Sequence, residues 1–143
     1  MNALQNALNG LVAKTYALTV LTHIAHWNVV GERFFELHAA FGSQYEELFD
    51  AVDTLAEQLR AIGGNPLTDV SEFVIALGNL PMLKKASDPV PELIAAHEDI
   101  LADINAAVEL STKDLATQNI LLDRVNAHQK VVWMLNSTME SED

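Results

Sequence analysis

Cysteine is absent from this sequence of 143 residues. That absence excludes disulfide bridges and any metal site built on thiolates. Basic side chains are scarce, because eight Lys and Arg stand against twenty Asp and Glu, for a formal net charge of −12. Nucleic-acid binding depends on Lys and Arg that neutralise phosphates, and the two ends of the sequence, "MNALQNALNG" and "MESED", carry no basic tail. We therefore expect no direct DNA binding, and we expect the acidic surface to attract cations.

Long apolar runs are also missing. No stretch reaches the ~18 apolar residues that a membrane helix needs, and the first residues lack the basic, apolar and cleavage regions of a signal peptide. We expect no membrane association and a cytoplasmic location. The length suits one domain over residues 1–143, with a core of its own.

Apolar residues recur at alternating spacings of three and four along most of the chain, which predicts amphipathic helices. The first helix is predicted over residues 4–29 and the second over residues 32–62, with Gly31 at the reversal between them. The second helix stops at Gly63 and Gly64, a typical C-terminal signal.

Two more long helices are predicted in the second half of the chain. Residues 67–81 indicate a short helix, closed by Gly78, inside a long connection. Residues 87–110 indicate a long helix with Asp88 as its N-cap. The "STKD" segment at 111–114 resembles a capping box that starts the last helix. No strand-like alternation is present. The sequence therefore predicts an all-α, ferritin-like four-helix bundle with a short extra helix in the crossover between the second and third helices.

The stretch "AHWNVVGERFFELHAAFG" holds two histidines twelve positions apart, on either side of Gly31. His26 lies five residues before Gly31 and His38 lies seven after it, so an antiparallel hairpin places them at nearly the same level. Two imidazoles on adjacent helices can share one metal or neighbouring metals. The alternative for His38, which falls on the apolar stripe, is a hydrogen-bonded core histidine.

Asp53 and Glu57 form an i,i+4 pair of carboxylates on one face of the second helix. His38 and Asp53 are fifteen residues apart, about 22 Å along a continuous helix, so they cannot bind one metal within one chain. They could do so if two copies of this helix crossed antiparallel about a two-fold axis near Glu46 and Glu47. Spacing alone favours the alternative, a solvated acidic face. The Glu-x-x-His motif of many di-iron bundles is absent from the sequence.

Two regions, "AHWNVVGERFFELHAAF…Y…D…AE…IGG" and "DLATQNILLDRVNAHQKVVWML", resemble the signature regions of the Dps family of mini-ferritins. The resemblance implies a hollow dodecamer of 23 symmetry that oxidises Fe(II), usually with hydrogen peroxide and otherwise with O2, and stores ferric mineral. It also implies a ferroxidase centre across a dimer interface, with His26 and His38 from one subunit and Asp53 and Glu57 from its two-fold mate. Zn(II) suits the same donors and is a surrogate metal for them.

The sequence departs from the family pattern at Gly42, where an aspartate usually follows the second histidine by one turn. Glycine offers no ligand, which leaves open a ferroxidase of reduced activity or, as the alternative, a metal-binding or architectural shell with an impaired centre. Glu46, His23 and water stay open as replacements. Trp27 is a core residue by default, whereas in the family the corresponding tryptophan lies beside the iron site and can supply an electron.

His97 and His128 fall on apolar stripes and are predicted to be structural. Asn119 occupies a position where the resemblance implies an aspartate near an iron-entry pore. Asp114 and Asp123 are pore candidates, with solvated surface acids as the alternative for each.

Overall fold

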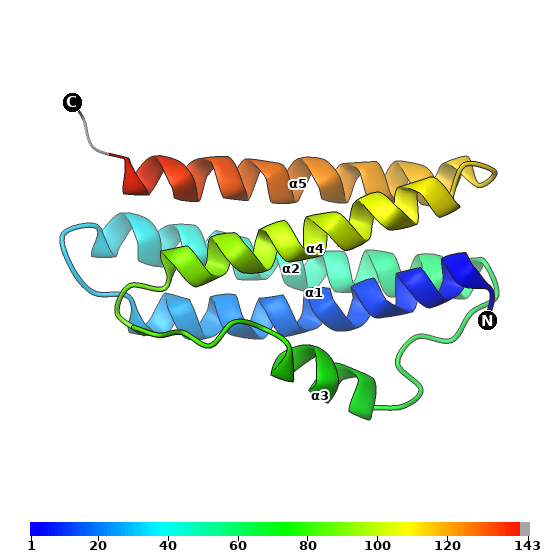
Figure 1. Ribbon diagram of the computed structural model, residues 1–143, viewed down its shortest axis with the longest axis horizontal. Coiled ribbons are helices and arrows are strands. Elements are labelled where there is room, and N and C mark those ends of the chain that lie inside the picture. Colours follow the sequence, from blue (N-terminus) through cyan, green and yellow to red (C-terminus); the bar gives the residue numbers. More distant parts are fainter. Residues whose placement is uncertain (141–143) are drawn as a thin grey trace.

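The computed structural model describes residues 1–140, which contain five helices and no strand (Figure 1). The four long helices form two antiparallel hairpins, α1–α2 and α4–α5, and the crossover makes α2 and α4 run in the same direction, while the short helix lies outside the bundle. This confirms the predicted all-α bundle with an extra helix in the crossover. The helices are α1 (Ala3–Asn28), α2 (Phe34–Ala61), α3 (Ser71–Gly78), α4 (Val90–Leu110) and α5 (Leu115–Met139).

The α1–α2 hairpin reverses where the sequence predicts it. Gly31 has φ +117°, a conformation that residues with a side chain rarely adopt. The 28 residues of α2 form one uninterrupted helix of about 42 Å. The helix ends at a second positive-φ glycine, Gly63, at φ +92°. Because α2 is continuous, residues near its two ends stay far apart within one chain.

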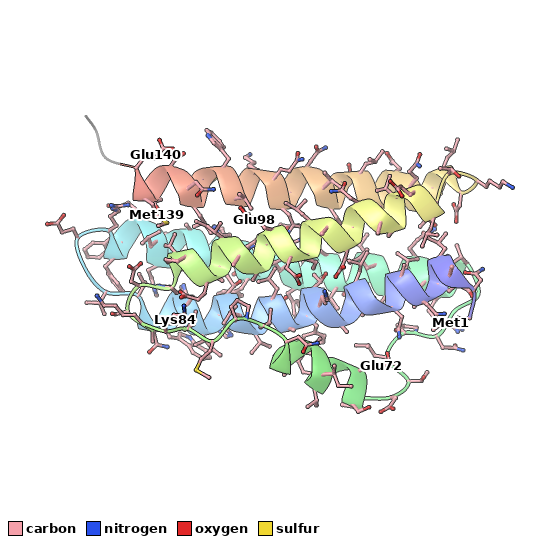
Figure 2. All side chains as sticks on the ribbon, in the orientation of Figure 1. Met1, Glu72, Lys84, Glu98, Met139 and Glu140 are labelled. Atoms are coloured by element: carbon pink, nitrogen blue, oxygen red, sulfur yellow. The ribbon has the colours of Figure 1, made fainter. Side chains whose placement is uncertain are left out.

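The crossover between α2 and α4 returns along the outside of α1 (Figure 1). The α3 residue Ala76 is buried against Ala13 and Ala17 of α1. Asn9 of α1 makes two hydrogen bonds to this segment. Its side-chain amide donates to the carboxylate of Glu72, which is labelled in Figure 2. Its side-chain oxygen accepts from the Leu67 N–H at 2.8 Å. The short helix is therefore fixed against α1 by an apolar contact and by two hydrogen bonds.

The predicted start of α4 is wrong by a small margin. Asp88 is not the N-cap, because Pro89 already has near-helical angles of φ −84° and ψ −3° and takes the cap position itself. Proline has no side-chain acceptor, so the first turn of α4 has no side-chain cap.

The predicted capping box at 111–114 is also absent. Ser111 closes α4 instead, and its hydroxyl donates to the Val108 carbonyl at 2.7 Å. Asp114 is the N-cap of α5, where its carboxylate accepts from the Thr117 N–H at 3.1 Å. The last helix therefore begins three residues later than the pattern indicated, and the turn between the two helices is longer.

Among residues 1–140, none of the helices combines the length and the apolar character that crossing a membrane requires.

Candidate metal centre

His26 and His38 lie side by side across the α1–α2 hairpin. Their rings are stacked, with centroids 3.8 Å apart and an interplanar angle of 15°. The prediction that these two residues lie at one level is therefore confirmed. Both side chains are half-buried, so the pair is reachable from outside and is not an enclosed part of the core.

Two reciprocal hydrogen bonds fix these rings. The Nδ1 atom of His26 lies 2.7 Å from the carbonyl oxygen of His38, and Nδ1 of His38 lies 2.7 Å from the carbonyl oxygen of His26. A carbonyl only accepts, so each Nδ1 carries the proton and donates it. In the neutral form of each ring, Nε2 is then the nitrogen without a proton. Histidines that bind metals usually have this arrangement, with the second ring nitrogen anchored to a backbone carbonyl or a carboxylate.

An aromatic group extends from the pair along α1 and α2. The ring of His23 lies 4.1 Å from Trp27 and 4.4 Å from Tyr45, and Tyr45 lies 5.4 Å from His26. Tyr45 was not among the residues singled out from the sequence, although its place two turns after His38 could have indicated it. His23 itself is 6.3 Å from His26, measured between ring centroids.

The default placement of Trp27 in the core is wrong. Its side chain is 61% exposed. In the last turn of α1 the buried positions are Ala25 and Val29, and Trp27 points away from both toward His23. The side chain therefore lies at the surface, against His23.

Gly42 faces His26 directly across the hairpin. A Cβ atom added at this position would lie 3.3 Å from Cε1 and 3.5 Å from Nδ1 of His26. Any side chain here would touch the imidazole, and its ring would have to move by a few tenths of an ångström. The aspartate of the family pattern would thus lie beside His26.

The two carboxylates do not reach the histidines within one chain. Asp53 and Glu57 are both exposed on α2, and the fifteen-residue separation between Asp53 and His38 spans about 22 Å of continuous helix. At about 100° per residue, Asp53 nevertheless lies within about 60° of His38 around the helix axis. Within residues 1–140 of one copy, no three His, Asp or Glu side chains come close enough together to hold a metal ion.

Partly or largely exposed apolar side chains lie on α2 between the histidines and the carboxylates, and on α1 and α3. Phe49 is 53% exposed and packs edge-on against Tyr16 of α1, with ring centroids 6.4 Å apart. Tyr16 also contacts Phe73 of α3 at 5.0 Å. Val74 and Ile75 of α3 are exposed as well. We call these five residues the aromatic face.

The remaining sequence candidates lie elsewhere. His97 and His128 are buried in the bundle and hydrogen-bond to each other. Asp114 serves as the α5 cap, and Asn119 and Asp123 are exposed on α5. A pore forms only between several copies, so the pore assignment stays a prediction.

A model of the ferritin-like domain family matches residues 5–142. The DNA protection during starvation protein of Brevibacillus brevis is 32% identical over 138 residues, which cover 93% of this chain and 92% of that protein. A solved Dps protein of Vibrio cholerae, described as a member of a broad superfamily of ferritin-like diiron-carboxylate proteins, is 30% identical. It has a TM-score of 0.82 and covers 96% of this chain and 89% of its own. Dps of Listeria innocua soaked with zinc is 29% identical, with a TM-score of 0.87 and 95% coverage of each chain.

The fold is that of the ferritin-like proteins, which place metal chemistry on bundles of four helices. Within that class, the chain belongs to the Dps family of mini-ferritins. The family supports a general role in iron storage and protection.

Proposed function

We propose that this protein is a ferroxidase that stores iron, with each centre shared between two copies of the chain. His26 and His38 of one copy and Asp53 and Glu57 of the other bind the Fe(II) that is to be oxidised. Hydrogen peroxide, or O2 in its place, is the oxidant, and the ferric product is stored in a hollow dodecamer. The proposed location is the cytoplasm, without direct DNA binding.

The observation that carries this proposal is the pair of reciprocal hydrogen bonds between the two histidines. Both Nδ1 atoms are committed to backbone carbonyls at 2.7 Å. Both Nε2 atoms are therefore free to bind a metal, and the rings are already oriented before it arrives. Histidines that serve only to pack the core would be fully buried. These two rings are half-buried, and each is held by a hydrogen bond that leaves Nε2 available.

The second copy follows from the position of the donors along α2. Two α2 helices that cross antiparallel near Glu46 bring His38 of each beside Asp53 of the other, because both residues lie on one side of the helix. Phe49, the member of the aromatic face on α2, lies between these two positions. Exposed apolar side chains often mark an interface with another protein, and a second copy of the chain would cover Phe49 while completing both centres.

The chemistry needs donors that favour the higher charge of Fe(III). Two carboxylates and two neutral imidazoles form such a set. Two Fe(II) ions give one electron each to one hydrogen peroxide molecule, whose O–O bond breaks. With two water molecules the products are two FeO(OH) units and four protons, so atoms and charge balance. Two oxidisable side chains lie nearby: Tyr45, whose ring is 5.4 Å from that of His26, and Trp27, which packs against His23.

We expect the purified protein to form a soluble ferric core when it receives Fe(II) and hydrogen peroxide. The centres direct oxidation to the inside of the shell, whereas iron oxidised in free solution precipitates. The measurement is iron retained with the protein after size-exclusion chromatography, with electron microscopy of the cores. The double variant His26→Gln, His38→Gln is the control and should retain little iron. Iron that precipitates equally with both proteins would contradict the proposal.

Gly42 favours a second candidate, a shell that binds metal but oxidises it slowly. The variant Gly42→Asp separates the two, because its carboxylate would lie beside His26. If the natural centre is competent, we expect the initial rate of Fe(II) oxidation to rise by less than about tenfold, equivalent to 1.4 kcal/mol in the barrier. Gly42→Asn is the matched control, since it has the same shape and no charge. A far larger gain with Asp alone would favour the impaired shell.

A further inference from the structure

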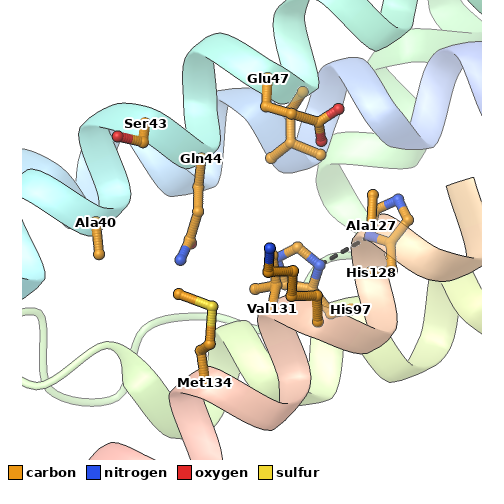
Figure 3. A pocket seen from close by; sticks show the side chains of 11 residues that line it. Ala40, Ser43, Gln44, Glu47, His97, Ala127, His128, Val131 and Met134 are labelled. Atoms are coloured by element: carbon orange, nitrogen blue, oxygen red, sulfur yellow. Dashed lines mark hydrogen bonds between the residues drawn. The ribbon is translucent and has the colours of Figure 1, made fainter.

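A cavity of about 380 Å³ lies between α2, α4 and α5, away from the histidine pair at the hairpin (Figure 3). Much of its wall is apolar, with Leu48 of α2 and Val131 and Met134 of α5 among the lining residues. Its volume and apolar wall are typical of pockets for small molecules, which span roughly 300–1,000 Å³ and carry few polar groups.

A chain of hydrogen bonds with a fixed direction runs beside this cavity. Arg124 can only donate, and it donates to the carboxylate of Glu47 and to Nε2 of His128, the latter at 3.1 Å. His128 therefore carries its proton on Nδ1. That Nδ1 lies 2.8 Å from Nδ1 of His97, to which it donates. The proton of His97 must then be on Nε2.

Burial keeps both rings neutral, so that each has one N–H. His97 and His128 are 0% and 1% exposed. Desolvation, with the nearby positive charge of Arg124, lowers the pKa of His97 to about 4. Desolvation lowers the pKa of His128 to about 2, with His97 and Arg124 adding to the effect.

The chain of donors ends without an acceptor. Nε2 of His97 is buried and has no hydrogen-bond partner in residues 1–140, and the same is true of the side-chain oxygen of Gln44. Gln44 is only 9% exposed. In Figure 3, Gln44 and Met134 lie on the opposite side of the cavity from His97 and His128. Buried polar groups in proteins are nearly always paired, so the unpaired Nε2–H of His97 indicates that the cavity has an occupant that accepts a hydrogen bond.

We propose that this cavity binds a small monocarboxylate with an apolar chain, whose oxygen accepts from Nε2–H of His97. Lys130 also lines the cavity and contributes a positive charge. Glu47 does not repel an anion strongly, because Arg124 neutralises it. The apolar lining accepts the hydrocarbon part of the ligand. A metal cation does not suit this place, because the guanidinium group of Arg124 already occupies the space between Glu47 and His128.

The site is independent of the proposed ferroxidase centre. None of its groups belongs to the histidine pair or to the two α2 carboxylates, so either proposal can fail without the other.

Calorimetric titration of the assembled, iron-free protein at neutral pH tests the proposal with three probes of equal chain length: hexanoate, hexan-1-ol and hexylammonium. We expect saturable binding of hexanoate, at least about tenfold tighter than the alcohol because its hydrogen bond is charge-assisted, and no binding of the cation. The absence of saturable hexanoate binding, as a cavity filled by water alone would give, overturns the proposal. Equal binding of acid and alcohol, or tighter binding of the cation, also overturns it.

Two variants locate the binding. Ala127→Leu fills the cavity from α5 and should abolish hexanoate binding, whereas Ala102→Leu, the same change at an exposed position on α4, should leave it unchanged. His97→Phe keeps a ring but removes the N–H and should weaken binding by about tenfold. If His97→Phe fails to fold, the Ala127→Leu and Ala102→Leu pair decides alone: equal hexanoate binding by these two proteins overturns the proposal.

Discussion

Two inactive variants of this protein should regain ferroxidase activity when their chains assemble together. One variant lacks the imidazoles, His26→Gln with His38→Gln, and the other lacks the carboxylates, Asp53→Asn with Glu57→Gln. Each alone has only damaged centres. In a mixed dimer, one centre takes intact histidines from one chain and intact carboxylates from the other, while the second centre loses all four donors.

Random pairing makes half of the dimers mixed, and one of the two centres in each is intact. About a quarter of the wild-type rate of Fe(II) oxidation is therefore expected for a two-fold interface of this kind. The measurement is the initial rate after the two variants are unfolded and refolded together in equal amounts. The control is the same two proteins assembled separately and then mixed, which should stay inactive. No recovery on joint assembly would mean that the donors are not shared between copies.

The free energy of unfolding should fall as the pH drops from 6.5 to 5. In the folded protein the pKa values of His97 and His128 are about 4 and about 2, below the 6.5 of an unperturbed histidine. The unfolded chain therefore binds more protons in this range, and stability that is fully present above pH 6.5 is lost as the pH falls toward the folded values. At pH 5 the expected loss is on the order of 2 kcal/mol for each histidine.

Urea unfolding of the iron-free protein at several pH values and one fixed protein concentration measures this effect, since dissociation of an oligomer depends on concentration. The range above pH 5 lies clear of most Asp and Glu titration. The double variant His97→Phe, His128→Leu removes both titrating rings and should flatten the dependence. A slope that is unchanged in the double variant would assign the acid sensitivity to other groups.

The sequence predicted most of the fold because helical periodicity is a local property. The spacing of apolar residues located four long helices and the short helix, and Gly31 located the reversal. Counting residues from that glycine was enough to place His26 and His38 at one level. The errors in the fold prediction concern where α4 and α5 begin, because the conformation of a single residue determines the first residue of a helix. Pro89 adopts helical angles and takes the N-cap position of α4, and Ser111 ends α4 but does not begin α5.

For the candidate centre, sequence counting also established that α2 is too long for His38 and Asp53 to meet within one copy, since the rise per residue of a helix is fixed. The tertiary structure decided what depends on helix rotation and on side-chain rotamers. It determined that each Nδ1 anchors to the opposite backbone, that Trp27 is exposed, and that Arg124 binds both His128 and Glu47. The i,i+4 spacing of Arg124 and His128 was visible in the sequence. Their partners on other helices were not, because contacts between helices depend on how the helices pack and not on the order of residues within any one of them.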